Sequence, residues 1–578
     1  MKIKVNYIIE EGKKRKKVEA EVGKTILELF NEDIEKASEN NLPIVGVRVN
    51  NSVKRLDYKI AKIDENVDVE LINVYNKDGR DIYIRTLLFI MSKAIYELYP
   101  KMLIKVEYQL TNAMYITIGN KLVTDKLLKE IKTKMQEIVE KELDINVKRM
   151  TKEEADVFYS KFITDRGELQ LLNKDKKDVV LYYCEKYFNY FYGILPTTTK
   201  EIKRFDLKKY NDGFLVMYPD AKDFKQKIEF KNTKKIAKAF EEYQEVYKLL
   251  GIQTIADLNE RIKKDPRELI VLSEALHEKK IFDLSQKIQN KKDVKMILIA
   301  GPSSSGKTTF AGKLSSALKI IGIKPKTISV DNYFVEREDT PVDEKGNYDF
   351  ETIDAIDTKL FNKDLKALIE GKEIEMPTFD FHTGHKVYDG KKMKLNKDEI
   401  LIIEGIHCLN DKLTEKIEEK YKFKIYISAL TVLNIDSFNR ISTTDTRMIR
   451  RTIRDNETRG YSAKHTLGMW YSVRRGEIKN IFPFQENADF VFNSSAIYEL
   501  AVLKKHIIPL LKEISKDKRE YSEARRIVSF MRYFEDIPDE LVPSNSLIRE
   551  FIGGSLYEER RQKLAKAMNN KETKKKKK

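Results

Sequence analysis

The residues best suited to chemistry lie in one short stretch, AGPSSSGKTT, at residues 300–309. Gly301 and Gly306 are separated by four residues and are followed at once by Lys307 and Thr308. Such spacing is typical of a phosphate-binding loop, in which glycines let the backbone N–H groups at a helix N-terminus surround a phosphate. We expect Lys307 to bridge the β- and γ-phosphates of a nucleotide and the Thr308 hydroxyl to ligate Mg²⁺. The predicted ATP contacts of the loop are Gly301, Ser303, Ser304, Ser305, Gly306, Lys307, Thr308 and Thr309.

Two other apolar runs end on a carboxylate. ILIIEG places Glu404 at the end of a predicted buried strand, and TISVDNYF places Asp331 after another. Because open α/β sheets bind ligands at such strand ends, we expect Glu404 to hold Mg²⁺; an acidic helix cap is the alternative. Phosphate transfer to a hydroxyl needs a group that accepts the proton, and Asp331 is suited to this role, although a turn-forming aspartate would look the same.

A third candidate is the arginine-rich stretch DTRMIRRTIRDNETRG, residues 445–460. Arg447, Arg450 or Arg451, and Arg454 share one face of the predicted helix. A row of this kind can close over phosphates and neutralise charge in the transition state. A solvated basic helix is the alternative.

The surrounding pattern can position these residues. The short apolar runs MILIA, TISV, ILII, KIYIS and DFVF alternate with helical patterns over residues 291–515. This alternation predicts a parallel sheet flanked by helices, with the phosphate loop between the strand MILIA and a helix whose Phe310, Leu314 and Leu318 share one face.

Six motifs in residues 296–493 resemble, in order, those of the uridine kinase and phosphoribulokinase family of P-loop kinases, and uridine kinase more closely. They are GPSSSGKTT, VDNYF, NYDF, PTFDFHTG, LIIEGI and the arginine-rich stretch. The resemblance implies ATP and Mg²⁺ as cofactors and a nucleoside as substrate.

The resemblance also implies roles for single residues. Asp331 takes the position of the general base for a 5′-hydroxyl, and Asp349 that of the carboxylate that binds ribose hydroxyls. Phe379 takes the position of the aromatic residue that contacts the base. Further predicted positions are Tyr333, His382 and His385 on the substrate side, Arg451 at ATP, and Arg454 and Arg459 at the transferring phosphoryl group.

Three departures from the family pattern fall near the nucleobase. Phe379 replaces a tyrosine, Gly384 replaces a histidine with His382 and His385 close by, and Tyr461 replaces a basic residue. Kinase chemistry is therefore better supported by the sequence than a preference for uridine.

The first half of the chain carries a different resemblance. Residues 1–75 resemble the TGS domain, a β-grasp fold, and residues 76–230 resemble the second additional domain of threonyl-tRNA synthetase. No histidine precedes His277, so the histidine-dependent editing or zinc site of those synthetases cannot exist here in that form. Seven of the eleven residues from Tyr182 to Tyr192 are aromatic. They form either an RNA-stacking surface or, as we expect, a packed core.

The length and composition of the chain indicate its number of domains and its kind of partner. A chain of 578 residues predicts several domains: residues 1–75, 76–230, a helical connector at 231–290, the kinase-like region 291–515, and a helical extension with a disordered lysine tail at 516–578. The predicted fold class is thus multidomain α+β and α/β. The formal net charge of +17 indicates either a polyanion partner such as RNA or a lysine-rich surface. Two distant cysteines, and the lack of a signal peptide or membrane span, predict a cytoplasmic protein.

Taken together, the sequence predicts an ATP-dependent nucleoside kinase directed to uridine or cytidine. The alternatives are an RNA- or ribosome-associated protein that uses nucleotide as a switch, and a kinase of sugar phosphates. A homo-oligomer is compatible with the sequence, which does not fix the assembly.

Overall fold

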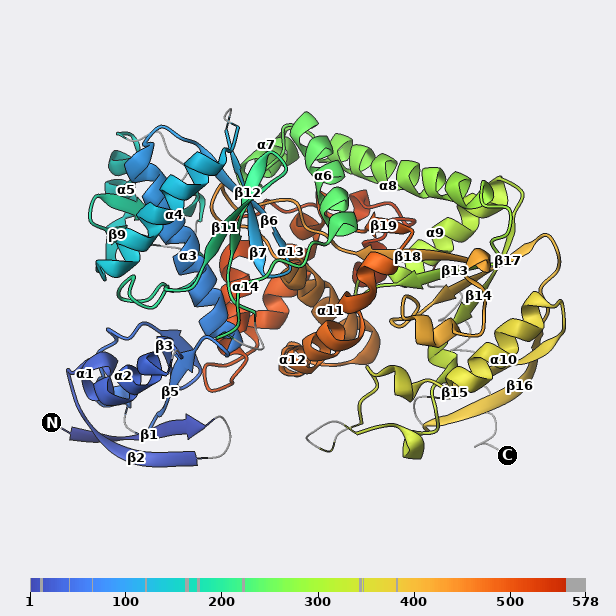
Figure 1. Ribbon diagram of the computed structural model, residues 1–578, viewed down its shortest axis with the longest axis horizontal. Coiled ribbons are helices and arrows are strands. Elements are labelled where there is room, and N and C mark those ends of the chain that lie inside the picture. Colours follow the sequence, from blue (N-terminus) through green and yellow to red (C-terminus); the bar gives the residue numbers. More distant parts are fainter. Residues whose placement is uncertain are drawn as a thin grey trace.

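The computed structural model describes residues 2–10, 14–40, 42–64, 66–119, 122–161, 166–173, 177–220, 224–342, 346, 348–380 and 383–557. The lysine tail and His382 lie outside them. The first half of the chain lies on one side of the molecule and the phosphate-loop region on the other, with the long helix α8 (Pro266–Gln289) spanning the distance between them (Figure 1).

The first module is a five-stranded sheet in the order β2-β1-β5-β3-β4. Its strands are β1 (Lys2–Glu10), β2 (Lys14–Glu21), β3 (Ile44–Val49), β4 (Ser52–Lys54) and β5 (Asp68–Asn73). Strands β1 and β2 pair antiparallel, and β1 also pairs in parallel with β5. Helices α1 (Ile26–Leu29) and α2 (Asn31–Glu39) follow Thr25, which forms a capping box with Glu28 as its sequence predicts.

The next region combines one long helix with two antiparallel sheets. The sheets have the orders β11-β12-β7-β6 and β10-β9-β8. Their strands are β6 (Ile104–Leu110), β7 (Ala113–Ile118), β8 (Asn146–Thr151), β9 (Asp178–Cys184), β10 (Tyr187–Asn189), β11 (Asp206–Tyr210) and β12 (Gly213–Met217). The helices are α3 (Lys77–Leu98), α4 (Asp125–Glu140) and α5 (Lys152–Tyr159).

The core of this region includes α3 and the aromatic run. Every residue of α3 from Leu87 to Ile95 is buried. The aromatic run belongs to the core as expected: of its seven rings, only that of Tyr183 is partly exposed, and the remainder are at most 9% exposed. Those six rings therefore present no stacking surface to a ligand.

A buried ion pair stands beside Cys184. The Lys93 ammonium is fully buried and donates to Glu97, to Glu185 at 2.7 Å and to the Cys184 carbonyl at 3.3 Å. Burial raises the pKa of the Cys184 thiol to about 11, so the residue is a neutral core side chain near pH 7.

Residues 231–290 contain the helices α6 (Lys234–Leu249), α7 (Ile255–Lys264) and α8, as the helical pattern of this segment predicts. Gly251 lies in the turn after α6 with a φ of +67°, and Pro266 occupies the first turn of α8.

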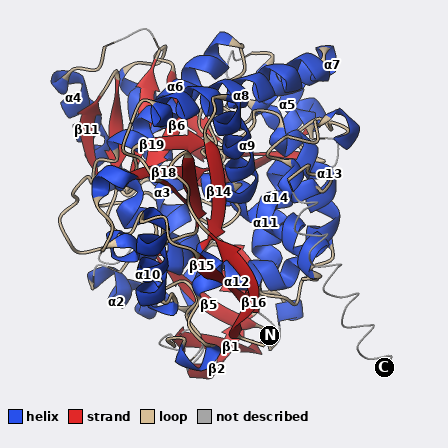
Figure 2. Cartoon of the chain, turned by 90° about the vertical axis from the view of Figure 1, so that its right-hand side faces the viewer, coloured by secondary structure: helices blue, strands red, loops and turns tan. Residues whose placement is uncertain are grey.

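The phosphate-loop region contains a five-stranded, fully parallel sheet in the order β14-β17-β13-β18-β19. Its strands are β13 (Met296–Ala300), β14 (Lys324–Ser329), β17 (Glu399–Glu404), β18 (Lys422–Ser428) and β19 (Phe490–Asn493), which confirms the five predicted runs. Figure 2 shows β14 and β18 between helices.

Alternate residues of these strands face opposite layers, as strand geometry requires. Ile297 and Ile299 pack with α8 and with α9 (Lys307–Ile320), whereas Met296 and Leu298 join the larger core that continues into the rest of the chain. The remaining elements are α10 (Thr358–Ile369), the hairpin β15 (Ile374–Asp380) and β16 (His385–Met393), α11 (Thr443–Arg459), α12 (Ala463–Asn480), α13 (Glu499–Lys512), α14 (Tyr521–Met531) and α15 (Arg549–Ile552).

The two halves of the chain are joined by buried contacts at the segment before α11. The Asn434 side chain donates to the Val106 carbonyl at 2.6 Å, and Asn439 donates to the Tyr190 carbonyl at 2.9 Å. Arg526 of α14 pairs with Asp445 in the first turn of α11. The front half is therefore packed against the base of the arginine-rich helix. Among the described residues, no helix is long and apolar enough to cross a membrane.

Candidate active site

The phosphate loop joins the central strand β13 to α9. Ser304 and Gly306 adopt positive φ angles of 58° and 86°, which turn the chain sharply before α9 begins at Lys307. Gly301 lies so close to β18 that a Cβ atom there would meet the Ile427 carbonyl oxygen at 2.1 Å. The Lys307 ammonium folds back onto the loop and donates to the Gly301 carbonyl at 2.9 Å.

Several charged side chains act on the Lys307 ammonium. Burial lowers the pKa of its ammonium, while the charges of Glu404, Asp331 and Glu550 act in the opposite direction and Arg454 adds to the lowering. The two strand-end carboxylates predicted from the sequence are therefore close enough to Lys307 to affect its pKa. Arg454 of α11 and Glu550 near the C-terminus are close enough as well.

The donors expected for Mg²⁺ are one carboxylate and one hydroxyl. Glu404 is 8% exposed, at the C-terminal end of β17, and the half-buried Thr308 is in the first turn of α9. Within the described ranges, no group of three or more His, Cys, Asp or Glu side chains could hold a metal ion. A carboxylate and a hydroxyl are oxygen donors of the kind that Mg²⁺ takes in nucleotide sites, where phosphate oxygens and water supply its other ligands.

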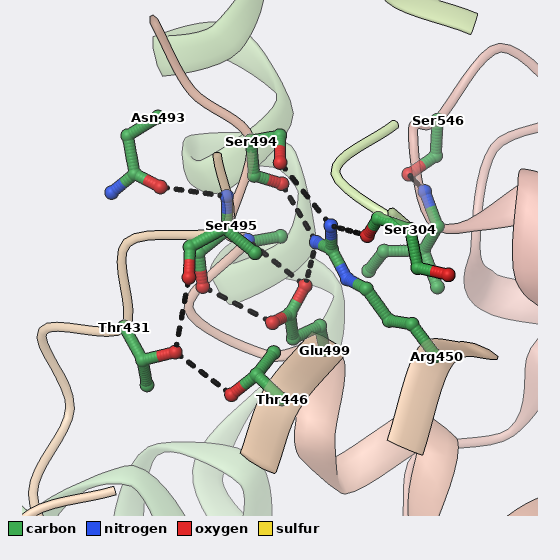
Figure 3. Close-up of polar contacts among 12 residues, drawn as sticks. Ser304, Thr431, Thr446, Arg450, Asn493, Ser494, Ser495, Glu499 and Ser546 are labelled. Carbon is green, nitrogen blue, oxygen red and sulfur yellow. Dashed lines mark hydrogen bonds and ion pairs between the residues drawn. The ribbon is translucent and has the colours of Figure 1, made fainter. Parts of the chain in front are cut away.

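Two arginines of α11 hold the phosphate loop from behind. Arg447 forms a buried ion pair with Glu477 of α12 and donates to the Ser303 carbonyl at 3.0 Å. Arg450 pairs with Glu499 and donates to the Ser494 carbonyl at 2.8 Å and the Ser304 carbonyl at 3.5 Å (Figure 3). Both side chains are at most 1% exposed. They serve the loop as buried supports and do not line an open phosphate site.

The other three arginines of α11 interact with one buried carboxylate. Asp455 accepts from Arg451 at 3.1 Å and Arg454 at 3.0 Å, and it pairs with Arg459 at 3.2 Å. Arg451 also donates to the Ser303 hydroxyl at 2.9 Å. The structure thus joins the three predicted arginines through one carboxylate that the sequence analysis did not single out, and Arg451 connects them to the phosphate loop.

The acceptor side begins at Asp331, which is exposed in the turn after β14. Asp349 is half-buried and accepts from the Glu351 N–H at 3.1 Å. Burial raises the pKa of Glu351 to about 7, with Glu477 and Asp349 adding to the shift and Arg451 and Lys307 opposing it. Glu351 therefore interacts electrostatically both with Asp349 on the acceptor side and with Arg451 of α11.

His407, directly after β17, is a further acceptor-side group that sequence reasoning missed. It is 1% exposed, and burial lowers its pKa to about 4 despite the charges of Asp349 and Asp354. The ring is therefore neutral near pH 7.

The residues predicted as aromatic and histidine contacts of the substrate differ in their burial. Phe379 is 5% exposed, and its ring lies 5.5 Å from that of Phe334. Tyr333 is fully buried and its hydroxyl donates to Asp364 at 3.1 Å, which gives it a role in the core. His385 is exposed on the β15–β16 hairpin and contacts Glu336 at 2.8 Å.

A parallel sheet, a phosphate loop on its central strand, and strand-end carboxylates beside the loop lysine define a P-loop phosphotransferase. Comparisons with known proteins agree. Residues 296–501 match the sequence model of the Phosphoribulokinase / Uridine kinase family. A uridine kinase of Borrelia duttonii (strain Ly) is 33% identical over 236 residues, which is 39% of this chain and 98% of that protein.

Two further likenesses cover the same region. A uridine kinase of Staphylococcus aureus (strain JH9) is 28% identical over 36% of this chain and 91% of that protein. A solved structure described as a possible uridine kinase from Bacillus stearothermophilus is 21% identical over 37% of this chain and 98% of that chain, with a TM-score of 0.26. The chain belongs to the phosphoribulokinase/uridine kinase family and is an enzyme of the nucleoside kinase class.

Proposed function

We propose that the protein transfers the γ-phosphate of ATP to the 5′-hydroxyl of a pyrimidine nucleoside, uridine or cytidine. The observation that carries the proposal is the grouping of Lys307, Asp331 and Glu404 at the carboxyl edge of the parallel sheet. The relatives named uridine kinase support the choice of acceptor.

In this mechanism the loop N–H groups and Lys307 bind the β- and γ-phosphates and hold the γ-phosphoryl group in line with the acceptor. Thr308 and Glu404 would hold Mg²⁺, which supplies positive charge to the phosphate oxygens. Asp331 orients the 5′-hydroxyl and accepts its proton, and Asp349 binds the ribose hydroxyls. Arg451 contacts ATP, while Arg454 and Arg459 neutralise the charge that spreads over the transferring group.

The base contacts are part of the same proposal. We assign the aromatic contact of the nucleobase to Phe379 and its polar contacts to His382 and His385, whereas the buried Tyr333 supports this segment from the core. The ring of Phe379 keeps the aromatic face but lacks a hydroxyl, so we assign no preference between uracil and cytosine.

We also propose that residues 1–75 form a TGS-like domain and residues 76–230 a synthetase-like domain, with boundaries to the connector, the kinase region and the C-terminal extension as predicted. The parallel pairing of β1 and β5 beside a capped helix supports a β-grasp fold for the first.

The test of the kinase assignment uses the purified full chain, Mg-ATP and a panel of nucleosides and sugar phosphates. ADP release stimulated by uridine or cytidine is expected. Asp331→Asn should lower kcat ~10²–10⁴-fold, because a positioned base contributes about that factor, while the Kd for ATP stays nearly unchanged. Asp339→Asn, at an exposed aspartate eight residues further on, is the matched control. Release stimulated by none of the nucleosides would overturn the assignment.

A further inference from the structure

The C-terminal segment 543–557 packs directly on the phosphate-loop helix. Ser546, Leu547 and Phe551 are fully buried, and Leu547 shares a core cluster with α8 and α9. The Phe551 ring lies 4.8 Å from the Arg450 guanidinium. On the side of α9, Lys313 donates to the Asn545 carbonyl at 2.9 Å. The backbone of the segment is therefore firmly held against the kinase region.

This packing places one carboxylate at the start of α9. A single oxygen of Glu550 accepts from the Thr309 N–H at 3.2 Å and from the Thr309 hydroxyl at 2.8 Å. The N-cap of α9 is Gly306, which offers no side chain to its first turn. Glu550 thus supplies, from 241 residues further along the chain, an anion at a helix N-terminus that lacks its own cap.

The same N–H group is needed by a nucleotide. A phosphate-binding loop holds phosphate oxygens with the backbone N–H groups of its helix, because these have no partner within the helix and lie at the positive end of its dipole. Thr309 is in the first turn, so its N–H cannot serve Glu550 and a phosphate oxygen at full strength together. The negative charge of Glu550, close enough to act on Lys307, also repels a polyphosphate.

We propose that Glu550 is a built-in competitor of the nucleotide, a carboxylate that occupies the anion site at Thr309 until ATP displaces it. The proposal rests on the proposed function, since it takes ATP as the ligand of the loop. Ser546 and Leu547 keep the segment on α9, so displacement consists of a rotation of the Glu550 side chain and a loosening of the single turn α15 that carries it. Glu550 stabilises the first turn of α9 in the empty enzyme and sets the nucleotide affinity.

The test is a calorimetric titration of the full-length protein with Mg-ATP at fixed salt concentration. Glu550→Ala should bind ATP roughly 5–10-fold more tightly than the wild type, since one competing hydrogen-bonded anion is removed. Glu550→Gln should lie between the two, because the amide oxygen still accepts but carries no charge. Glu540→Gln, at an exposed glutamate of the same extension, should bind as the wild type does. Unchanged or weaker binding by both Glu550 variants would overturn the proposal.

A measurement on the wild type covers the case in which the variants fail to fold. Mg-ATP should increase hydrogen exchange at residues 549–552 while it protects the first turn of α9. Protection of both segments would show that Glu550 is a fixed part of the ATP site and would also overturn the proposal. Wild-type protein that binds no ATP overturns the proposed function, whereas ATP binding with unchanged variants overturns only the competition.

Discussion

The phosphate side and the acceptor side of the candidate site are built differently. Behind the phosphate loop, Arg447 and Arg450 are held in ion pairs that are at most 2% exposed. On the acceptor side, β16 is largely exposed although most of β15 is buried, and the ion pair between His385 and Glu336 leaves the histidine side chain 52% exposed. One side is a desolvated network of ion pairs, and the other combines buried aromatic rings with charged groups that are in contact with water.

This difference in burial indicates which part of the site is held in one arrangement. Stabilising a transferring phosphoryl group requires charges that are already in place, and the buried ion pairs hold the phosphate loop that carries Lys307 in position. Of the three departures from the family pattern, Phe379 and Gly384 lie on the acceptor side, whereas Tyr461 follows α11 and its N–H donates to the Asp455 carbonyl at 3.1 Å. Two of the three departures therefore lie away from the buried ion pairs of the phosphate side.

The largest effect is expected where the buried network is broken. The carboxylate of Glu477 faces Arg447 and Arg474 and accepts from the Ser303 N–H at 3.2 Å. Glu477→Gln leaves Arg447 buried without its counter-charge and should lower the free energy of unfolding of the kinase region by ~3–5 kcal/mol. Urea unfolding of the full chain measures the change.

Glu415→Gln, at an exposed glutamate, should change that free energy by less than about 0.5 kcal/mol. A loss for Glu477→Gln as small as this would mean that the phosphate side is no more rigid than the acceptor side.

Much of the phosphate side could be predicted from the sequence because its signals are local. The loop spacing, the five apolar runs and the arginine row each lie within a few turns or one strand. The supports could not be predicted in this way. Ser303 meets Glu477 across 174 residues and Thr309 meets Glu550 across 241, and no periodicity links partners so far apart. The same limit applies to α3. Its own sequence does not show that distant parts of the chain cover its polar residues.

On the acceptor side, an intermediate effect is expected at Phe379. Base–aromatic contacts are worth about 1–3 kcal/mol, so Phe379→Leu should raise the KM for the nucleoside roughly 10-fold and leave the KM for ATP unchanged. Phe350→Leu is the matched control, because Phe350 is 37% exposed and contacts the same Phe334 ring. Equal changes in both KM values would show that the two sides are not separable.

The smallest effect is expected at the junction of the two sides, where Glu351 packs against Gly476. A Cβ atom on Gly476 would lie 2.7 Å from the Glu351 Cβ, so α12 and the acceptor segment are in close contact here. The pKa of Glu351 in the folded protein, about 7, lies above the ordinary glutamate value of 4.5, which means that folding favours the protonated carboxyl. Its contribution to stability is therefore complete below pH 4.5 and is lost as the pH rises through 7.

Glu351→Gln replaces this carboxyl by a neutral amide at every pH. The Tm of the variant should exceed that of the wild type by a margin that grows from pH 5 to pH 8 and then levels off, because the wild-type charge at the junction appears only over that range. Thermal unfolding at pH 5, 6, 7 and 8 measures the margin, with Glu415→Gln as the control for general charge effects. A margin that does not vary with pH would mean that Glu351 is charged throughout, and that the phosphate and acceptor sides share water at this point.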